Sequence, residues 1–190
     1  MKEAELRIIA ELMKNSRRSD RELAKATGLS QPTVSRVRTK LEKEGYIKEY
    51  TAIPDFERLG YELMGITFLK LRKTLEPEQI EEARRIAREK LEKSRFGIIM
   101  LERGLGLKYD GVVIALYNDY ANYLEHVNAL KQFPYFEITA IESFLINLKD
   151  TLHYRPLTFK ALAEHLLMKS RNREQPPALN RTKHASNRKL

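Results

Sequence analysis

Apolar residues recur every three to four positions through the first 45 residues, which is the spacing of amphipathic α-helices. The first such run covers residues 3–14, and two more cover Asp20–Thr27 and residues 30–44. The apolar positions of the first run are Leu6, Ile8, Ile9, Leu12 and Met13. The pattern predicts three short helices.

The ends of these helices are marked by capping residues. Ser19 and Glu22 form a capping box, because each side chain can bond the backbone amide of the other. Gly28 can end that helix with a positive φ, which costs glycine little. Ser30 is suited to cap the next helix, and Pro32 falls in its first turn, where no backbone hydrogen bond is lost. The turn between the two helices is therefore tight.

The third helix has two different faces. At 100° per residue its buried stripe consists of Val34, Val37 and Leu41. The opposite side carries Pro32, Ser35, Arg36 and Thr39. Gly45 ends the helix, and residues 46–54, "YIKEYTAIP", alternate as a strand or small wing does. This order predicts a winged helix-turn-helix domain over residues 1–50.

In that motif the second helix of the pair enters the major groove of double-stranded DNA. Arg36 can pair with guanine and Gln31 with adenine, while hydroxyl side chains suit phosphate or the thymine methyl group. The predicted contacts on this helix are Gln31, Pro32, Thr33, Ser35, Arg36, Arg38 and Thr39. The predicted phosphate contacts are Lys40, Arg17, Arg18 and Arg21. Arg38 lies at the edge of the buried stripe, so it either braces the fold or contacts phosphate.

The pattern changes in the middle of the chain. Segment 62–72 is apolar on both faces, and residues 76–94 form a charged helix whose apolar stripe is Ile80, Ala83, Ala87 and Leu91. The segments that follow are strand 96–102, a Gly-containing turn, strand 109–117, helix 120–132 and strand 136–149. The order βαββαβ predicts a ferredoxin-like domain, so the fold class is α+β.

The predicted organisation has five parts. They are the winged helix-turn-helix 1–50, a linker 51–62, the ferredoxin-like domain 63–150, a C-terminal helix 151–170 and a tail 171–190. The C-terminal helix has Phe159, Leu162 and Leu166 on one stripe. The tail has too few apolar residues to order itself, and we expect a solvated terminus or a flexible arm on phosphate.

The strands of the second domain predict a partner. Helices of a ferredoxin-like domain cover one face of its sheet, yet these strands are apolar on both faces. A homodimer or higher homo-oligomer would bury the second face. The alternatives are a misassigned strand or a sheet covered by the C-terminal helix.

The formal charge of +9 is concentrated at the two ends of the chain. Residues 1–50 hold 12 Lys and Arg against 8 Asp and Glu, residues 51–150 hold 14 against 16, and residues 151–190 hold 9 against 2. This split indicates polyanion binding by the termini. The absence of cysteine excludes disulfides, thiolate metal sites and thiol nucleophiles, and fits a cytoplasmic protein.

No catalytic, metal or cofactor motif is visible. The four histidines lack metal-ligand spacing, and no phosphate loop, nucleophile elbow or dinucleotide fingerprint occurs. No segment reaches the ~20 apolar residues of a membrane helix, and the charged N-terminus is unlike a signal peptide. We therefore expect no cofactor, no metal and no membrane association.

The chain resembles the Lrp/AsnC family of prokaryotic transcription regulators over about residues 3–150. The first part of the resemblance is carried by "SDRELAKATGLSQPTVSRVRTKLEKEGYIKEYTAIPDFERLGYE". The second part is carried by the βαββαβ order and a turn ending in "YDG". The resemblance implies a DNA-binding head and a RAM/ACT-like dimerisation domain, with assembly into larger oligomers and a response to amino acids.

Family effector contacts map onto the turn between the second and third strands, at Gly104, Gly106, Tyr109 and Asp110. An exposed aspartate there can receive an ammonium group, and backbone amides can receive a carboxylate. The chain departs from the family in its longer turn, its longer helix 76–94, its C-terminal extension and the residue types at Val37 and Arg38.

Two other functions fit the same architecture. An architectural protein would bind DNA with little sequence preference. Siroheme decarboxylases also resemble Lrp/AsnC regulators, but the segment where they carry histidine and aromatic residues here reads "SRFGIIMLERG", without histidine. The sequence therefore favours a sequence-specific regulator over an enzyme.

Overall fold

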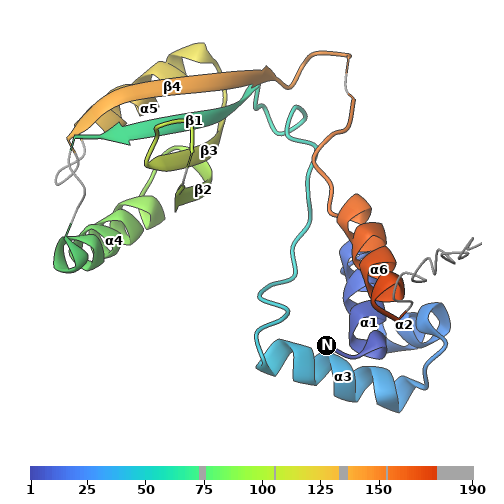
Figure 1. The fold of residues 1–190 in the computed structure, drawn as a ribbon. Helices are drawn as coiled ribbons and strands as arrows, with labels where there is room; N and C mark the ends of the chain where they lie inside the picture. The colour runs from blue at the N-terminus through green and yellow to red at the C-terminus, as the bar shows by residue number, and fades with distance from the viewer. Residues whose placement is uncertain (73–75, 105, 133–136, 153, 175–190) are drawn as a thin grey trace, which may run out of the picture. The chain divides into compact units, whose positions relative to one another are not determined.

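The structure is a computed structural model and describes residues 1–72, 76–104, 106–132, 137–152 and 154–174. These residues form two compact units. The first unit contains Met1–Ile53 together with the C-terminal residues from Arg155, and the second is Pro54–Tyr154. The chain therefore leaves the first unit and returns to it after completing the second (Figure 1).

Three of the predicted helices form the core of the first unit. They are α1 (Glu3–Lys14), α2 (Asp20–Thr27) and α3 (Gln31–Lys43). Their apolar faces meet in one cluster, whose buried members are Ile8, Leu12, Leu23, Val34, Val37 and Leu41. This cluster confirms the predicted stripe of the third helix, and Ile47 packs against it from the segment that follows.

The expected strand over residues 46–54 is absent, and the chain there is irregular. A strand requires a hydrogen-bonded neighbour, and no ladder in the described part of the chain includes these residues. Side chains hold the segment instead. The Ser16 hydroxyl donates to the Thr51 carbonyl at 3.1 Å, and the Arg38 Nε donates to the Tyr50 hydroxyl at 2.9 Å.

The C-terminal helix α6 (Lys160–Glu174) belongs to the first unit and packs against α1 (Figure 1). An ion pair of 2.8 Å joins the Lys14 Nζ to a Glu164 carboxylate oxygen. The predicted stripe of this helix was wrong. Phe159 and Leu162 are about half exposed, whereas Ala163 is fully buried.

Helix α1 can hold α6 because it is apolar on two sides. Ile8 faces the cluster with α2 and α3, while Ala10 lies 200° further round the helix. Ala10 is nevertheless fully buried. Both helices carry a fully buried alanine, Ala10 on α1 and Ala163 on α6. The helical residues 171–174 were predicted as tail, and the rest of the predicted tail, 175–190, lies outside the described residues.

The second unit has the predicted βαββαβ order, and the α+β fold class is confirmed. Its elements are β1 (Leu63–Leu71), α4 (Pro77–Glu92), β2 (Gly97–Arg103), β3 (Gly111–Tyr117), α5 (Tyr120–Lys131) and β4 (Ile138–Asn147). The strands form one antiparallel sheet in the order β2-β3-β1-β4. The predicted strand at 109–117 begins two residues later, because Tyr109 and Asp110 belong to the turn before it.

One face of this sheet is covered by helices. Its core contains Leu69 from β1 and Val113, Ala115 and Tyr117 from β3, with side chains of α5 packed against them. A Cβ atom at Gly65 would lie 2.8 Å from the Tyr117 ring, so glycine is required beneath that ring. The predicted apolar stripe of α4 faces the same side of the sheet.

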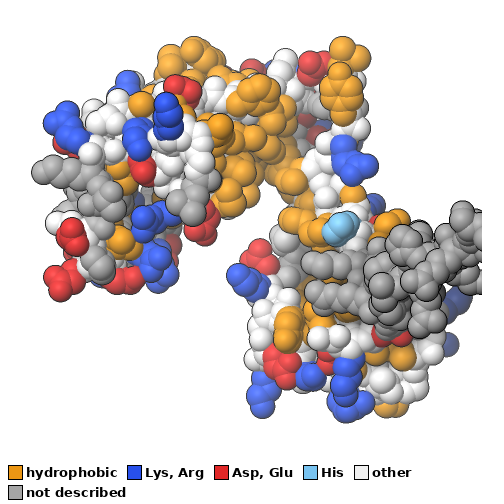
Figure 2. All heavy atoms as spheres, in the orientation of Figure 1, with side chains coloured by type: hydrophobic (Ala, Val, Ile, Leu, Met, Phe, Trp, Pro, Cys, Tyr) orange, Lys and Arg blue, Asp and Glu red, His pale blue; other side chains and the backbone are white. Residues whose placement is uncertain are grey.

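The other face of the sheet carries a continuous row of apolar side chains. Strand register places Met100, Ile114, Ile66 and Phe144 side by side across all four strands. Phe144 is 66% exposed. Figure 2 shows hydrophobic side chains gathered over the strands of this unit. None of the described helices is long and apolar enough to cross a membrane.

Candidate nucleic-acid interface

The turn between α2 and α3 has the capping geometry that the sequence predicts. The Glu22 amide donates to the Ser19 hydroxyl at 3.3 Å, and the Ser19 amide donates to the Glu22 carboxylate at 2.7 Å. The Ser19 hydroxyl also donates to the Glu22 carboxylate at 2.7 Å, and this bond, together with the one from the Ser19 amide, lowers the pKa of Glu22. Gly28 has a φ of 73°, and the Thr33 amide donates to the Ser30 hydroxyl at 3.4 Å. Both helices therefore begin and end at fixed residues.

Anchoring of α3 through Val34, Val37 and Leu41 turns its polar residues outward. The exposed side chains of the helix include Gln31, Pro32, Ser35, Arg36 and Thr39, as predicted. Thr33 is half-buried, and its hydroxyl lies 2.8 Å from that of Ser30. Arg36 has no hydrogen-bond or ion-pair partner among the described residues. Its guanidinium is thus available to an external acceptor.

Arg38 is engaged in the fold. Its guanidinium lies 3.2 Å from an Asp20 oxygen and 3.1 Å from a Glu42 oxygen, and it donates to the Tyr50 hydroxyl. The same guanidinium lies 4.9 Å from the centre of the Tyr50 ring. These contacts join α2, α3 and the segment after α3. The structure therefore places Arg38 in the bracing role.

Two predicted phosphate contacts are also paired within the unit. The Lys40 Nζ lies 2.7 Å from a carboxylate oxygen of Glu5, which is a buried residue of α1. This hydrogen bond raises the pKa of Lys40 and lowers that of Glu5. Arg18 forms an ion pair with Glu11. Both cations neutralise carboxylates of α1.

The remaining predicted cations, Arg17 and Arg21, are exposed, and their side chains have no partner in the described part of the chain. Lys43 was missed in the sequence. It lies seven residues after Arg36, on the same side of α3, and it too is exposed without a partner among the described residues. The i, i+7 spacing from Arg36 was the signal that could have identified it.

The four predicted effector residues surround the turn between β2 and β3. The Gly104 amide donates to the Asp110 carbonyl at 3.2 Å, and the Tyr109 amide donates to the Gly106 carbonyl at 3.0 Å. The Asp110 carboxylate accepts from the Leu71 amide at 2.8 Å and lies 3.2 Å from the Lys70 Nζ. The Leu71 bond, together with Lys70, lowers the pKa of Asp110. This carboxylate is therefore already paired within the domain.

The fold and this surface define a winged helix-turn-helix protein with a ferredoxin-like second domain. A family model described as Winged helix-turn-helix DNA-binding matches residues 1–48. An uncharacterized HTH-type transcriptional regulator of Pyrococcus furiosus is 34% identical over 110 residues, which are 58% of this chain and 68% of that relative. Two regulators of Pyrococcus abyssi also match, and each match covers less than half of the length of that regulator.

Two solved structures share the fold. LrpC of Bacillus subtilis superposes with a TM-score of 0.62 at 22% identity, over 82% of this chain and 99% of LrpC. A transcriptional regulator of Neisseria meningitidis, solved as a complex with L-Met, superposes with a TM-score of 0.64 at 20% identity, over 85% of this chain and 99% of that protein. The chain belongs to the Lrp/AsnC family of HTH-type transcriptional regulators.

Proposed function

We propose that this protein is a sequence-specific DNA-binding regulator of transcription that acts as a homodimer in the cytoplasm and has no catalytic role. The observation that carries the proposal is the outer surface of α3, where Arg36 is exposed and has no partner among the described residues. An unpaired guanidinium near the start of a recognition helix suits the O6 and N7 atoms of guanine.

The basic residues of the first unit, together with Gln31, divide into three groups under this proposal. Arg36 and Gln31 read base edges, while Arg17, Arg21 and Lys43 contact phosphates. Arg38, Lys40 and Arg18 hold the helices in place through their carboxylate partners. The contacts expected of Pro32, Thr33, Ser35 and Thr39 with phosphate or the thymine methyl group remain predictions.

The open face of the sheet supports the homodimer. A row of apolar side chains on all four strands is unusual for a surface that remains in water. Because α6 packs on α1, a second copy of the sheet is the cover that we propose. Dimers of this kind place two reading helices on one DNA duplex, which raises affinity for sites with two half-sites.

An amino acid is the effector class that we propose for the turn between β2 and β3. The Neisseria meningitidis relative was solved with L-Met, which supports this class. Gly104, Gly106 and Tyr109 contribute backbone and ring surface at the turn. An ammonium group would have to compete with Lys70 for Asp110, so binding there depends on that lysine moving.

The experiment that tests the main proposal selects DNA fragments from the protein's own genome on the purified protein. Competition with scrambled DNA of the same composition then measures the specificity ratio. We expect a ratio on the order of 10³ or more, as for sequence-specific regulators. Equal affinity for selected and scrambled fragments would identify an architectural DNA-binding protein instead.

A further inference from the structure

The second unit contains a cavity of about 750 Å³ between α4 and the helix-covered face of the sheet. This volume is within the range of about 300–1,000 Å³ found for small-molecule sites. The cavity exists because the middle of α4 presents alanine to the sheet. Ala83 is buried, yet its methyl group and that of Ala87 are too short to fill the space.

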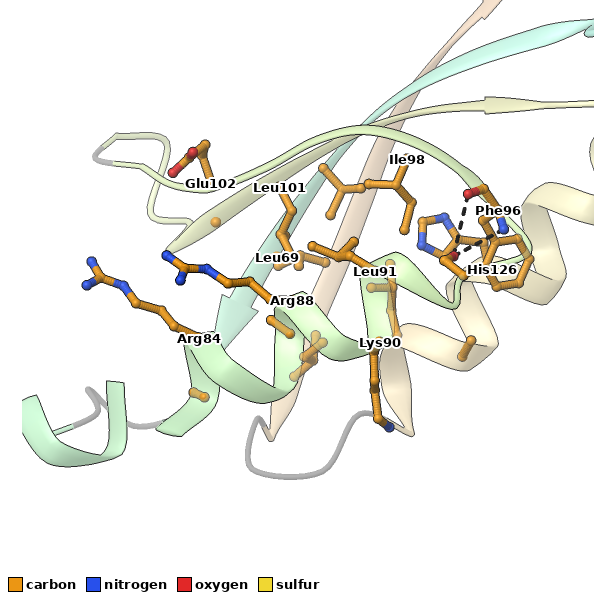
Figure 3. A pocket seen from close by; sticks show the side chains of 18 of the residues that line it. Leu69, Arg84, Arg88, Lys90, Leu91, Phe96, Ile98, Leu101, Glu102 and His126 are labelled. Atoms are coloured by element: carbon orange, nitrogen blue, oxygen red, sulfur yellow. Dashed lines mark hydrogen bonds between the residues drawn. The ribbon is translucent and has the colours of Figure 1, made fainter. Parts of the chain in front are cut away.

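The floor of the cavity is aliphatic. Leu69 of β1 and Val113 of β3 are buried core residues that also line it, and β2 and α5 add further side chains. The additional aliphatic side chains of the floor and walls include Ile98, Leu101, Leu130, Ile138 and Leu91. Figure 3 shows Leu69, Leu101 and Ile98 on the sheet side of the cavity and Leu91 on α4 facing them. Such a surface binds the apolar body of a ligand in preference to water.

One end of the cavity is formed by His126, which is 2% exposed. Its Nδ1 lies 2.7 Å from the Tyr117 hydroxyl, and its ring stacks on Phe96 with centroids 4.5 Å apart. Burial lowers the pKa of His126 to about 4, so the ring is neutral at pH 7. The His126 ring therefore contributes no charge to this end of the cavity.

The opposite end is cationic. Arg84 and Arg88 lie one turn apart on α4, and in Figure 3 both extend toward the side where β2 carries Glu102. Arg84 is paired with Glu81 at 2.6 Å. Among the described residues, Arg88 has no hydrogen-bond or ion-pair partner. The guanidinium of Arg88 is thus a free donor at this opening.

The carboxylates around the cavity are mostly neutralised already. Glu89 is held by Arg85 at 2.9 Å, and Asp110 by Lys70 at 3.2 Å, which leaves Glu102 as the lining carboxylate without a partner in the described chain. Three lining cations lack such partners among the described residues: Arg88, Lys93 and Arg103. The excess of positive charge favours a monoanion over a cation or a zwitterion.

We propose that this cavity binds a small monocarboxylate with an alkyl or aryl body. The body lies on the aliphatic floor, and the carboxylate pairs with Arg88, whose planar guanidinium can donate two parallel hydrogen bonds. This site is distinct from the turn proposed for an amino acid. It lies within one domain and does not depend on the proposed DNA recognition.

The test is calorimetric titration of the full chain, without DNA, with decanoate as probe and decylamine as its cationic counterpart. We expect decanoate to bind at one site per chain and decylamine to bind at least tenfold more weakly, because its ammonium group would face Arg88. Equal binding of the two probes, or no binding of decanoate, would overturn the proposal.

Matched variants locate the site. Arg88→Gln should weaken decanoate at least tenfold, whereas Arg72→Gln should leave its affinity within twofold, since neither Arg72 nor its partner Glu137 lines the cavity. Ala83→Phe should fill the cavity and abolish binding, while circular dichroism reports whether the domain remains folded. Unchanged affinity in both Arg88→Gln and a folded Ala83→Phe variant would place decanoate elsewhere and refute the assignment.

Discussion

At the scale of single residues, the cations of the first unit differ in whether a carboxylate of the protein already pairs with them. Arg36 and Arg21 have no side-chain partners in the described chain, whereas Lys40 balances the buried Glu5. A sequence shows each of them as an exposed basic residue on a helix. Only the folded chain distinguishes a cation that is available to DNA from one that stabilises the domain.

Substitution of Arg36 should therefore affect specificity. Arg36→Ala is expected to cost about 1–3 kcal/mol at one base position and to relax preference there. Arg21→Ala is the matched control, and it should weaken all sites alike and reduce the salt slope by about 0.9. Competition binding on a set of single-base site variants measures both. If Arg36→Ala also weakened every site equally, the proposed contact of Arg36 with a base edge would be wrong.

His126 makes the stability of the second unit depend on pH. Its pKa of about 4 in the folded state lies below the 6.5 of a free histidine, so between these values the unfolded chain binds more protons. The contribution of His126 to stability is present above pH 6.5 and is lost as pH falls toward 4. Between pH 7 and pH 5 the free energy of unfolding should fall by about 2 kcal/mol on this account.

Urea unfolding of the native protein and of His126→Asn at pH 7, 6 and 5 checks this expectation. The variant should be less stable at pH 7, because it loses the ring that stacks on Phe96. Its stability should also change much less with pH over this window. The same pH dependence in both proteins would show that His126 titrates as an exposed group.

At the scale of helices and strands, the sequence predicted what local rules determine. The Ser19–Glu22 capping box, the Gly28 turn and the Val34–Val37–Leu41 stripe depend on residues within one or two helical turns of each other. The paired states of Lys40 and Arg18 were not predictable in this way. Glu5, the partner of Lys40, lies on another helix. Arg18 lies in the turn after α1, the helix that carries its partner Glu11, and the conformation of that turn decides whether the two side chains meet.

The packing of helix α6 could not be predicted from the local sequence either. Its apolar residues can be placed on more than one stripe, and a stripe does not identify the surface that it covers. The structure buries Ala163 instead, in a helix that packs against α1. The Lys14–Glu164 pair joins residues that are far apart in the chain. No local pattern encodes such a contact.

The role of α6 can be tested with two neighbouring substitutions. Ala163→Glu places a charged side chain in a fully buried position and should destabilise the first unit by about 2–4 kcal/mol. Leu162→Glu changes a side chain that is 51% exposed and should cost less than about 1 kcal/mol. Thermal unfolding and hydrogen exchange of the α6 amides measure the change in stability in each variant. Equal effects of the two variants would contradict packing of Ala163 on α1.

At the scale of the whole molecule, the two units differ in the surfaces that they expose. The first presents cations and has its apolar surface on α1 covered by α6, whereas the second keeps one apolar sheet face uncovered. A surface of this kind is a site for association, because water contact with it is unfavourable. Self-association through the sheet would also bring two DNA-binding units into one particle.

Phe144 is the position at which we expect a substitution to weaken this association most. It lies next to Ile66 in the apolar row and is largely exposed in the single chain, so Phe144→Glu would bury a carboxylate in the proposed dimer interface. Sedimentation velocity at micromolar concentration should then show a monomer in place of a dimer. Affinity for DNA with two half-sites should fall at the same time, because each monomer engages a single half-site.

Leu107→Glu is the matched control, since Leu107 is also exposed but lies in the turn between β2 and β3, outside the apolar row. It should leave the dimer intact. If Phe144→Glu sedimented as the same species as the native protein while remaining folded, the sheet face would not be the dimer interface. If both substitutions produced monomers, association would extend to the turn, and the interface would be larger than the apolar row alone.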